Sequence, residues 1–170
     1  MKNLRKKLLI NLLIIFTFIL FFRLSYLFFK ENRPFGNVAR CVETNRKVLA
    51  LTFDDGPCPN STEKILDLLK KYKSKATFFV LGMHIEKYPE IFKRIYLEGH
   101  EIGNHSWSHA RLELRSYSFI YNEFHSTEKK IRELGCKGTI HFRAPRGTGV
   151  LILPLILMKM KKNTFYGILS

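Results

Sequence analysis

Two adjacent carboxylates, Asp54 and Asp55, stand at the end of the apolar run Val48–Phe53. This run is rich in β-branched and aromatic residues and is closed by Gly56 and Pro57, so it predicts a buried strand. Unpaired acids at the end of a buried strand are unfavourable, because burying a charge without a partner is costly. A cation at this place would offset that cost. The alternative is an ordinary Asp-Asp-Gly turn without a function.

His105 and His109 could hold such a cation, because they lie four residues apart. Side chains at i and i+4 of a helical turn share a face, so both imidazoles can reach one metal ion. With the Asp55 carboxylate they form a two-histidine, one-carboxylate site with open positions, which suits a divalent metal that holds water. Asp54 is then free to act as a general base toward water at the metal. By itself, this histidine spacing also occurs by chance.

These side chains need elements that bring them together, and the sequence predicts strands that alternate with helices. The expected strands are Val48–Phe53, Ala76–Leu81, His100–Gly103 and Thr139–Phe142. The expected helices begin at Asn60, Pro89 and Tyr117, and the last two end at Gly99 and Gly135. In the first helix, the residues expected to face the core are Ile65, Leu68, Leu69 and Tyr72. Such alternation indicates an α/β fold with parallel βαβ units.

In parallel α/β folds, functional residues gather at the carboxyl ends of the strands. Asp54 and Asp55 end the first expected strand, and His105 and His109 follow the third. The fourth is followed by a further pair of polar residues, Arg143 and Arg146. The sequence therefore predicts that three polar groups meet at one rim of the sheet.

Three short motifs carry a resemblance to a known family: Thr52–Pro57, His105–His109 and Arg143–Gly147. In this order they resemble the first three motifs of the polysaccharide deacetylase family, also called the NodB homology domain or carbohydrate esterase family 4. The resemblance covers roughly residues 47–147 and implies a partial, irregular (β/α) barrel. It also implies metal-dependent removal of acetyl groups from N-acetylated sugars of a polysaccharide.

The resemblance assigns a role to each residue of the first two motifs. It implies that Asp54 is the catalytic base and that Asp55, His105 and His109 bind a divalent metal. Zinc is the ion that we expect.

The third motif would supply the remaining catalytic groups. The resemblance implies that Arg143 orients and tunes Asp54, and that the backbone N–H of Arg146 helps to hold the tetrahedral oxyanion. Pro145 and Arg146 are expected to contact the substrate. Many family members carry tyrosine at the position of Arg146. An arginine there could favour a substrate that carries a carboxylate or a peptide stem, and simple variation is the alternative.

The chain departs from the family pattern toward its end. The family continues with an aspartate–tryptophan motif and a Leu-x-His motif whose histidine acts as general acid, and neither is present here. We expect a helix over Leu155–Lys162, a strand over Phe165–Leu169 and an incomplete barrel with an exposed strand edge. Loss of the general acid would lower the rate of deacetylation by about 10²–10⁴-fold. The alternative function is therefore an inactive relative that binds metal or glycan without turnover.

The first 30 residues predict a membrane segment. Met1–Lys7 carries four basic residues and no acid, and Leu8–Phe29 is almost wholly apolar. Arg23 can extend its side chain to the interface, so the segment reaches about the 20 residues that a span needs. We expect an uncleaved single-pass anchor with the catalytic domain outside the cytoplasm. A removed signal peptide is the alternative. The expected organisation is an anchor over 1–30, a linker over 31–46 and the deacetylase domain over 47–170.

Composition limits the partners. The formal net charge is +15, which favours anionic partners such as wall polymers or lipid headgroups, or it reflects lysine-rich solvated helices. Nucleic acid is not expected, because the N-terminal segment directs export and no nucleic-acid-binding motif is present. Peptidoglycan is the favoured substrate, because the tether would hold the domain beside it. We expect a monomer.

The three cysteines, Cys41, Cys58 and Cys136, show no metal-binding spacing and receive no function.

Overall fold

The structure is a computed structural model that describes residues 2–32, 38–39, 45, 47–112, 115–147 and 164–165. It divides into two compact units, Met1–Phe35 and Gly36–Ser170. The first unit contains helix α1, Lys2–Asn32. Its segment Leu9–Tyr26 is long and apolar enough to cross a membrane, and a signal sequence meets the same criteria. The predicted apolar helix is confirmed, and its role as an anchor stays a prediction.

The second unit is built on a six-stranded sheet in which every neighbouring pair of strands is parallel. The order of the strands across the sheet is β1-β6-β5-β4-β3-β2. Their bounds are β1 Val38–Ala39, β2 Thr52–Gly56, β3 Thr77–Val80, β4 Glu101–Asn104, β5 His141–Phe142 and β6 Thr164–Phe165. The sheet is open, and the predicted α/β class is confirmed.

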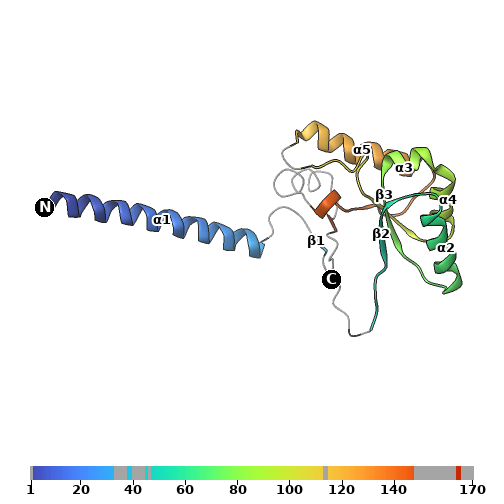
Figure 1. The fold of residues 1–170 in the computed structure, drawn as a ribbon, viewed down its shortest axis with the longest axis horizontal. Coiled ribbons are helices and arrows are strands. Elements are labelled where there is room, and N and C mark those ends of the chain that lie inside the picture. The colour runs from blue at the N-terminus through green and yellow to red at the C-terminus, as the bar shows by residue number, and fades with distance from the viewer. Residues whose placement is uncertain are drawn as a thin grey trace. The chain divides into compact units, whose positions relative to one another are not determined.

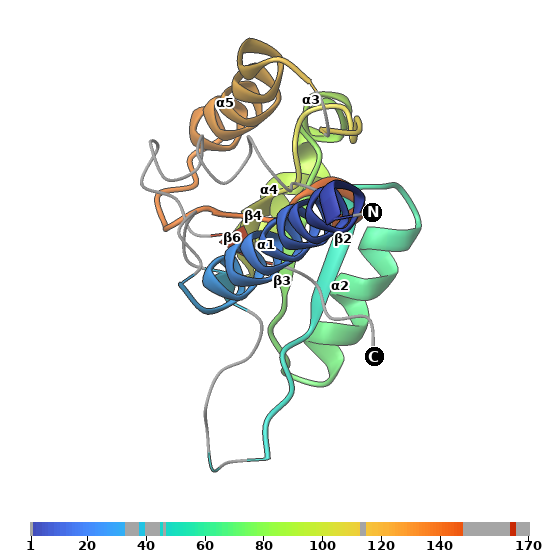
Figure 2. The same cartoon turned by 90° about the vertical axis from the view of Figure 1, so that its left-hand side faces the viewer.

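Four α-helices and one short 3₁₀-helix accompany the described strands of this unit. They are α2 Ser61–Lys71, α3 Gly82–Lys87, α4 Pro89–Leu97, α5 Tyr117–Glu133 and the 3₁₀-helix Pro145–Gly147. Helices α2 and α4 lie near each other beside β2 and β3, whereas α3 packs against α5 (Figures 1 and 2). The loop after β4 contacts both α3 and α5, because its backbone carbonyls accept from Gly82 and Met83 and its N–H groups donate to Glu123.

The main core lies between the sheet and these helices. Phe78 and Val80 of β3 are buried with Leu66 of α2 and Phe92 and Ile95 of α4. A second cluster joins α5 to β5 and contains Ile120, Phe124, Phe142, Ala144 and Leu112. Side chains of α5 are therefore packed directly against the strand that precedes Arg143.

The first predicted strand differs from the observed one. Strand β2 begins at Thr52 and contains both Asp54 and Asp55, whereas Val48 and Leu49 are 64% and 85% exposed. The prediction of a buried strand over Val48–Phe53 is therefore wrong. In the described part of the chain, β2 is an edge strand of the sheet, so it has a neighbouring strand, β3, on one side only.

The predicted apolar face of the first helix is also wrong in part. Leu68 and Tyr72 are 54% and 68% exposed, and the buried residues of α2 are Thr62, Leu66 and Leu69. Both patterns have helical spacing, but contact with α4 and the sheet selects the face centred on Leu66 and Leu69. Helix α3, Gly82–Lys87, was not among the predicted elements.

The other predicted elements agree with the structure to within a few residues. Helix α4 starts at Pro89, and Gly99 follows its end with a φ of 77°. Gly135 follows α5 with a φ of 94°. Strand β6 overlaps the start of the predicted strand Phe165–Leu169. The rest of that strand, the predicted helix Leu155–Lys162, Cys41 and most of the linker over 31–46 lie outside the described residues.

Candidate active site

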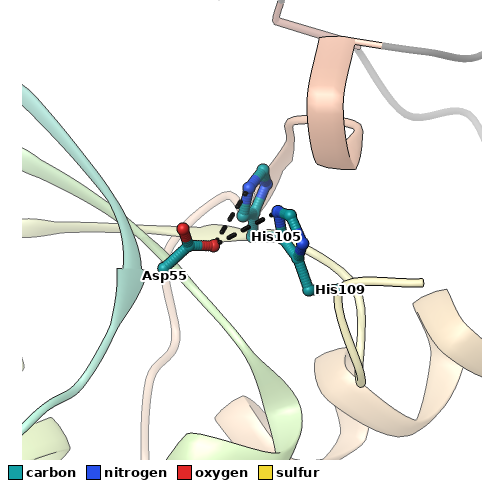
Figure 3. Close-up of side chains that lie close together, drawn as sticks. All are labelled: Asp55, His105 and His109. Atoms are coloured by element: carbon teal, nitrogen blue, oxygen red, sulfur yellow. Dashed lines mark ion pairs between the residues drawn. The ribbon is translucent and has the colours of Figure 1, made fainter. Parts of the chain in front are cut away.

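Asp55, His105 and His109 meet at one end of the sheet. The Asp55 Oδ1 atom lies 3.6 Å from His105 Nε2 and 3.4 Å from His109 Nε2. The three possible ligand atoms all lie within 4.8 Å of one another. Figure 3 shows the carboxylate from β2 pointing at both rings, which follow β4. The predicted convergence of an acid and two histidines is therefore present in the structure.

These separations fit a zinc site. Ligand atoms around a tetrahedral zinc ion, with bonds of about 2.0–2.2 Å, lie about 3.3–3.6 Å apart. Both distances from Asp55 Oδ1 fall in that interval. The donor set is also suitable, because imidazole nitrogen and carboxylate oxygen are common zinc ligands and three protein ligands leave a position open.

The backbone around Asp55 turns its carboxylate toward the histidines. Asp55 has a φ of 64°, and the register between β2 and β3 shifts between Phe53 and Gly56. Such an irregularity re-aims a side chain within a strand. His84 of α3 adds a hydrogen bond, because its Nδ1 lies 2.8 Å from the Asp55 carbonyl oxygen, which can only accept. His84 thus lies beside a candidate ligand.

His105 is oriented by a hydrogen bond at the far side of its ring. Its Nδ1 donates to the Arg143 carbonyl oxygen at 2.7 Å. The carbonyl can only accept, so Nδ1 carries the proton and Nε2 presents a lone pair toward Asp55. The imidazole is 3% exposed. Burial lowers its pKa, against the opposing effects of the Arg143 carbonyl and the two nearby carboxylates, so the neutral form that metals require is favoured.

Asp54 lies next to this cluster and is held by Arg143. The Arg143 Nη1 atom donates to Asp54 Oδ1 at 2.6 Å and to Thr52 Oγ1 at 3.0 Å. The other carboxylate oxygen, Oδ2, lies 3.8 Å from His105 Nε2. The guanidinium also lies 3.9 Å from the centroid of the Phe79 ring. Asp54 therefore has one oxygen occupied by Arg143 and a second one directed at the site.

The remaining predicted residues, Pro145 and Arg146, follow β5 in the short 3₁₀-helix. Arg146 has a φ of 57° and an exposed side chain, whereas Pro145 is buried. A left-handed residue at this point turns the chain sharply after Arg143. The roles of Pro145 and Arg146 toward the substrate stay predictions.

Sequence reasoning missed Glu123, whose carboxylate hydrogen-bonds the loop between the two histidines. A signal was present in the sequence. Glu123 falls on the apolar face of α5, one residue before Phe124 and three after Ile120. A charged residue on the buried face of an amphipathic helix is uncommon, because burying it needs specific partners.

Known proteins of one family are similar to this chain. Residues 42–162 match the model of the polysaccharide deacetylase family. The peptidoglycan-N-acetylmuramic acid deacetylase PdaC of Bacillus subtilis is 47% identical over 123 residues, which cover 69% of this chain and 26% of the relative. A peptidoglycan-N-acetylglucosamine deacetylase of Bacillus cereus is 42% identical over 118 residues, which cover 69% of this chain and 55% of the relative.

A solved structure gives the same result for the fold. The crystal structure of a peptidoglycan N-acetylglucosamine deacetylase in complex with 4-naphthalen-1-yl-N-oxidanyl-benzamide superposes with a TM-score of 0.72 and 36% identity. The superposition covers 76% of this chain and 60% of that chain. This chain thus spans about a quarter to about three fifths of the length of these similar proteins.

Proposed function

Because this chain belongs to the polysaccharide deacetylase family, we propose that it is a metal-dependent hydrolase that removes acetyl groups from N-acetylated sugars of peptidoglycan. The observation that carries the proposal is the triangle of Asp55, His105 and His109 beside the Asp54–Arg143 ion pair. The names of the two similar bacterial enzymes support peptidoglycan as the polymer.

Asp55, His105 and His109 would hold the metal, and we propose zinc. When bound, a zinc ion polarises a carbonyl group and makes water more acidic. The protein supplies the geometry: His105 is fixed through its Nδ1–H, and the Asp55 Oδ1 atom lies 3.6 Å and 3.4 Å from the two Nε2 atoms. Little rearrangement of these side chains would be needed to accept the ion.

Asp54 would be the general base that takes a proton from the attacking water. Its Oδ2 atom faces the site at 3.8 Å from His105 Nε2, and its Oδ1 atom is bound by Arg143. The guanidinium places a positive charge directly against this carboxylate. It also fixes the side chain in one orientation, which proton transfer requires.

Pro145 and Arg146 would form the substrate side of the site. The backbone N–H of Arg146 would hydrogen-bond the oxyanion that forms on the acetyl carbon. Its exposed, charged side chain supports a further role in contacting an anionic group of the glycan, such as a carboxylate or a peptide stem. Pro145 would shape the surface next to it.

The polymer is outside the cytoplasm, and the N-terminal segment would place the enzyme there. We propose that residues 1–30 are an uncleaved single-pass anchor, that 31–46 are the linker and that 47–170 are the deacetylase domain. The support is the apolar segment Leu9–Tyr26 and the basic residues that precede it.

The test is acetate release from N-acetylated peptidoglycan by the full-length chain in detergent, with zinc and after chelation. Acetate should appear only with metal, and Asp54→Asn should reduce the rate by about 10²–10⁴-fold while zinc binding persists. His105→Ala should abolish stoichiometric zinc binding. Zinc binding without any acetate release would favour the alternative, a relative that binds metal or glycan without turnover. Full zinc retention after loss of both histidines would exclude the metal site.

A further inference from the structure

The loop that carries the two candidate histidines has an unfavourable backbone conformation. Ser106 has a φ of 74° and His109 a φ of 58°, and neither is glycine. Residues with a side chain adopt this region rarely, because Cβ contacts the backbone. The loop therefore depends on contacts from outside itself to keep both imidazoles directed at Asp55.

Glu123 of α5 supplies three of those contacts. Its Oε2 atom accepts hydrogen bonds from the backbone N–H of Trp107 at 3.1 Å and of Ser108 at 2.9 Å. Its Oε1 atom accepts from the Ser108 hydroxyl at 2.8 Å. The residue is 9% exposed. Hydrogen bonds to a buried carboxylate are stronger than neutral ones, so Glu123 binds the segment between the two histidines firmly.

Asn104 connects the start of the loop to α5 and β4. Asn104, at the end of β4, accepts from the Ser106 N–H at 2.8 Å and donates to the Phe124 carbonyl oxygen at 2.9 Å. The Ser106 hydroxyl accepts from the His109 N–H at 3.2 Å. Thr127 donates to the Glu123 carbonyl oxygen at 3.0 Å. The position of each histidine thus depends on α5, and Glu123 is the one charged member of this set.

The fit of Trp107 makes the arrangement specific. A Cβ atom on Gly82 would lie 2.1 Å from the Trp107 ring, so the indole packs directly on the backbone of α3. The Trp107 ring packs against Gly82 and its backbone N–H donates to Glu123, so Trp107 is held from two sides. A loop fixed in this way needs no metal to keep its shape.

We propose that Glu123 is a positioning residue that preforms the two-histidine half of the metal site before the ion binds. The proposal rests on the proposed function, because it concerns the same site. Glu123 is not one of the three candidate ligands, Asp55, His105 and His109. It acts through Trp107 and Ser108. Its substitution should therefore weaken metal binding more than substitution of another glutamate on α5.

The test compares Glu123→Gln with the wild-type full-length chain in detergent. An amide has one acceptor oxygen in place of two, and its NH₂ group would face the N–H donors of the loop. Zinc affinity, measured by competition with a chromophoric chelator, should fall by about 10–100-fold. Glu133→Gln is the matched control, because Glu133 lies on the same helix, is 51% exposed and should leave the affinity unchanged.

Hydrogen exchange in the metal-free protein gives a second measurement that does not depend on zinc. The amides of Trp107 and Ser108 should be protected in the wild type and in Glu133→Gln, and should exchange at least tenfold faster in Glu123→Gln. If the wild type binds no zinc, the proposed function fails, but this measurement still decides the role of Glu123. Unchanged zinc affinity together with unchanged protection in Glu123→Gln would overturn the proposal.

Ser108→Ala covers the case in which Glu123→Gln does not fold. The Ser108 side chain is exposed and contributes one of the three hydrogen bonds, so the variant should fold. Its zinc affinity should fall by a few-fold and the Ser108 amide should exchange faster. Wild-type values for both quantities would count against the positioning role.

Discussion

Arg143 serves both halves of the candidate site with different groups. Its guanidinium donates to Asp54, the proposed base, while its backbone carbonyl oxygen accepts from Nδ1 of His105, a proposed ligand. Under the proposed function, the side chain would therefore act on the chemical step, and the main chain would act on metal binding. A substitution of Arg143 changes the first contact and leaves the second atom in place.

Arg143→Lys should separate these two effects. Lysine keeps the positive charge but cannot reach Asp54 and Thr52 from one planar group, so Asp54 loses its fixed orientation. We expect kcat for acetate release to fall by about 10–100-fold. Zinc affinity should stay within about twofold, because the carbonyl that orients His105 remains. Arg111→Lys, an exposed position in the loop before α5, is the control. An equal loss of zinc affinity in Arg143→Lys would show that the side chain acts through the metal site.

His100 is a buried titratable residue outside the site. It is 6% exposed, its Nδ1 accepts from the Ala76 N–H at 3.4 Å, and its Nε2 has no hydrogen-bond partner among the described residues. Burial, and then the charge of Lys75, lower its pKa below the ordinary value, against the opposing effect of Glu98. The folded protein therefore disfavours the charged imidazole.

This shift predicts a loss of stability in acid. Because the pKa of His100 is lower in the folded state, the neutral imidazole contributes to the free energy of unfolding, and this contribution is fully present above the unfolded pKa of about 6.5. It is lost as the pH falls from there through the folded pKa, since the unfolded chain binds the proton more readily. The free energy of unfolding, measured with urea at a series of pH values, should change less steeply with pH between 7 and 5 for His100→Gln than for the wild type. His125→Gln, at an exposed position on α5, should keep the wild-type slope.

At the scale of the elements, the site is made by the ends of adjacent parallel strands and by the packing behind them. Asp54 and Asp55 lie in β2, His105 directly follows β4, and Arg143 directly follows β5. Between them, Phe79 of β3 lies under the Arg143 guanidinium. Strand β4 makes room for that ring at Gly103, because a Cβ atom there would lie 2.3 Å from Phe79 Cδ1. The position of Arg143 thus depends on Gly103 through the Phe79 ring.

Gly103→Ala should therefore harm both stability and activity. The added methyl group forces the Phe79 ring to move, and overpacking of this kind costs about 1–3 kcal/mol. We expect a matching drop in the free energy of unfolding, measured with urea, and a lower kcat from the displaced Arg143. Gly138→Ala is the matched control, because a Cβ atom there meets nothing within 4 Å. Wild-type stability and kcat in Gly103→Ala would mean that Phe79 can move without disturbing Arg143.

At the scale of the whole molecule, the convergence of the candidate site residues could be predicted from the sequence, but many of the contacts that hold them in place could not. Asp55, His105 and His109 were found from residue type and spacing, because strand ends in a parallel sheet bring such residues together. The buried face of α2 was misplaced, since Leu68 and Leu66 differ only in which neighbour they meet in the folded protein. Glu123 was missed, because two of the three donors that it binds are backbone N–H groups, which the sequence does not distinguish.

The N-terminal segment gives the last prediction, which concerns where the whole chain lies. Leu9–Tyr26 is long enough to cross a bilayer, and the basic residues before it favour an N-terminus that stays inside. If it is an anchor, the chain with a C-terminal tag should stay in the membrane pellet after alkaline carbonate extraction and keep its N-terminal residues by mass spectrometry. Phe16→Arg should reduce insertion, because a charge at the helix centre costs about 2.5–3.5 kcal/mol. Recovery of a shorter, soluble chain would identify the segment as a removed signal peptide, which still delivers the catalytic domain to the same side of the membrane.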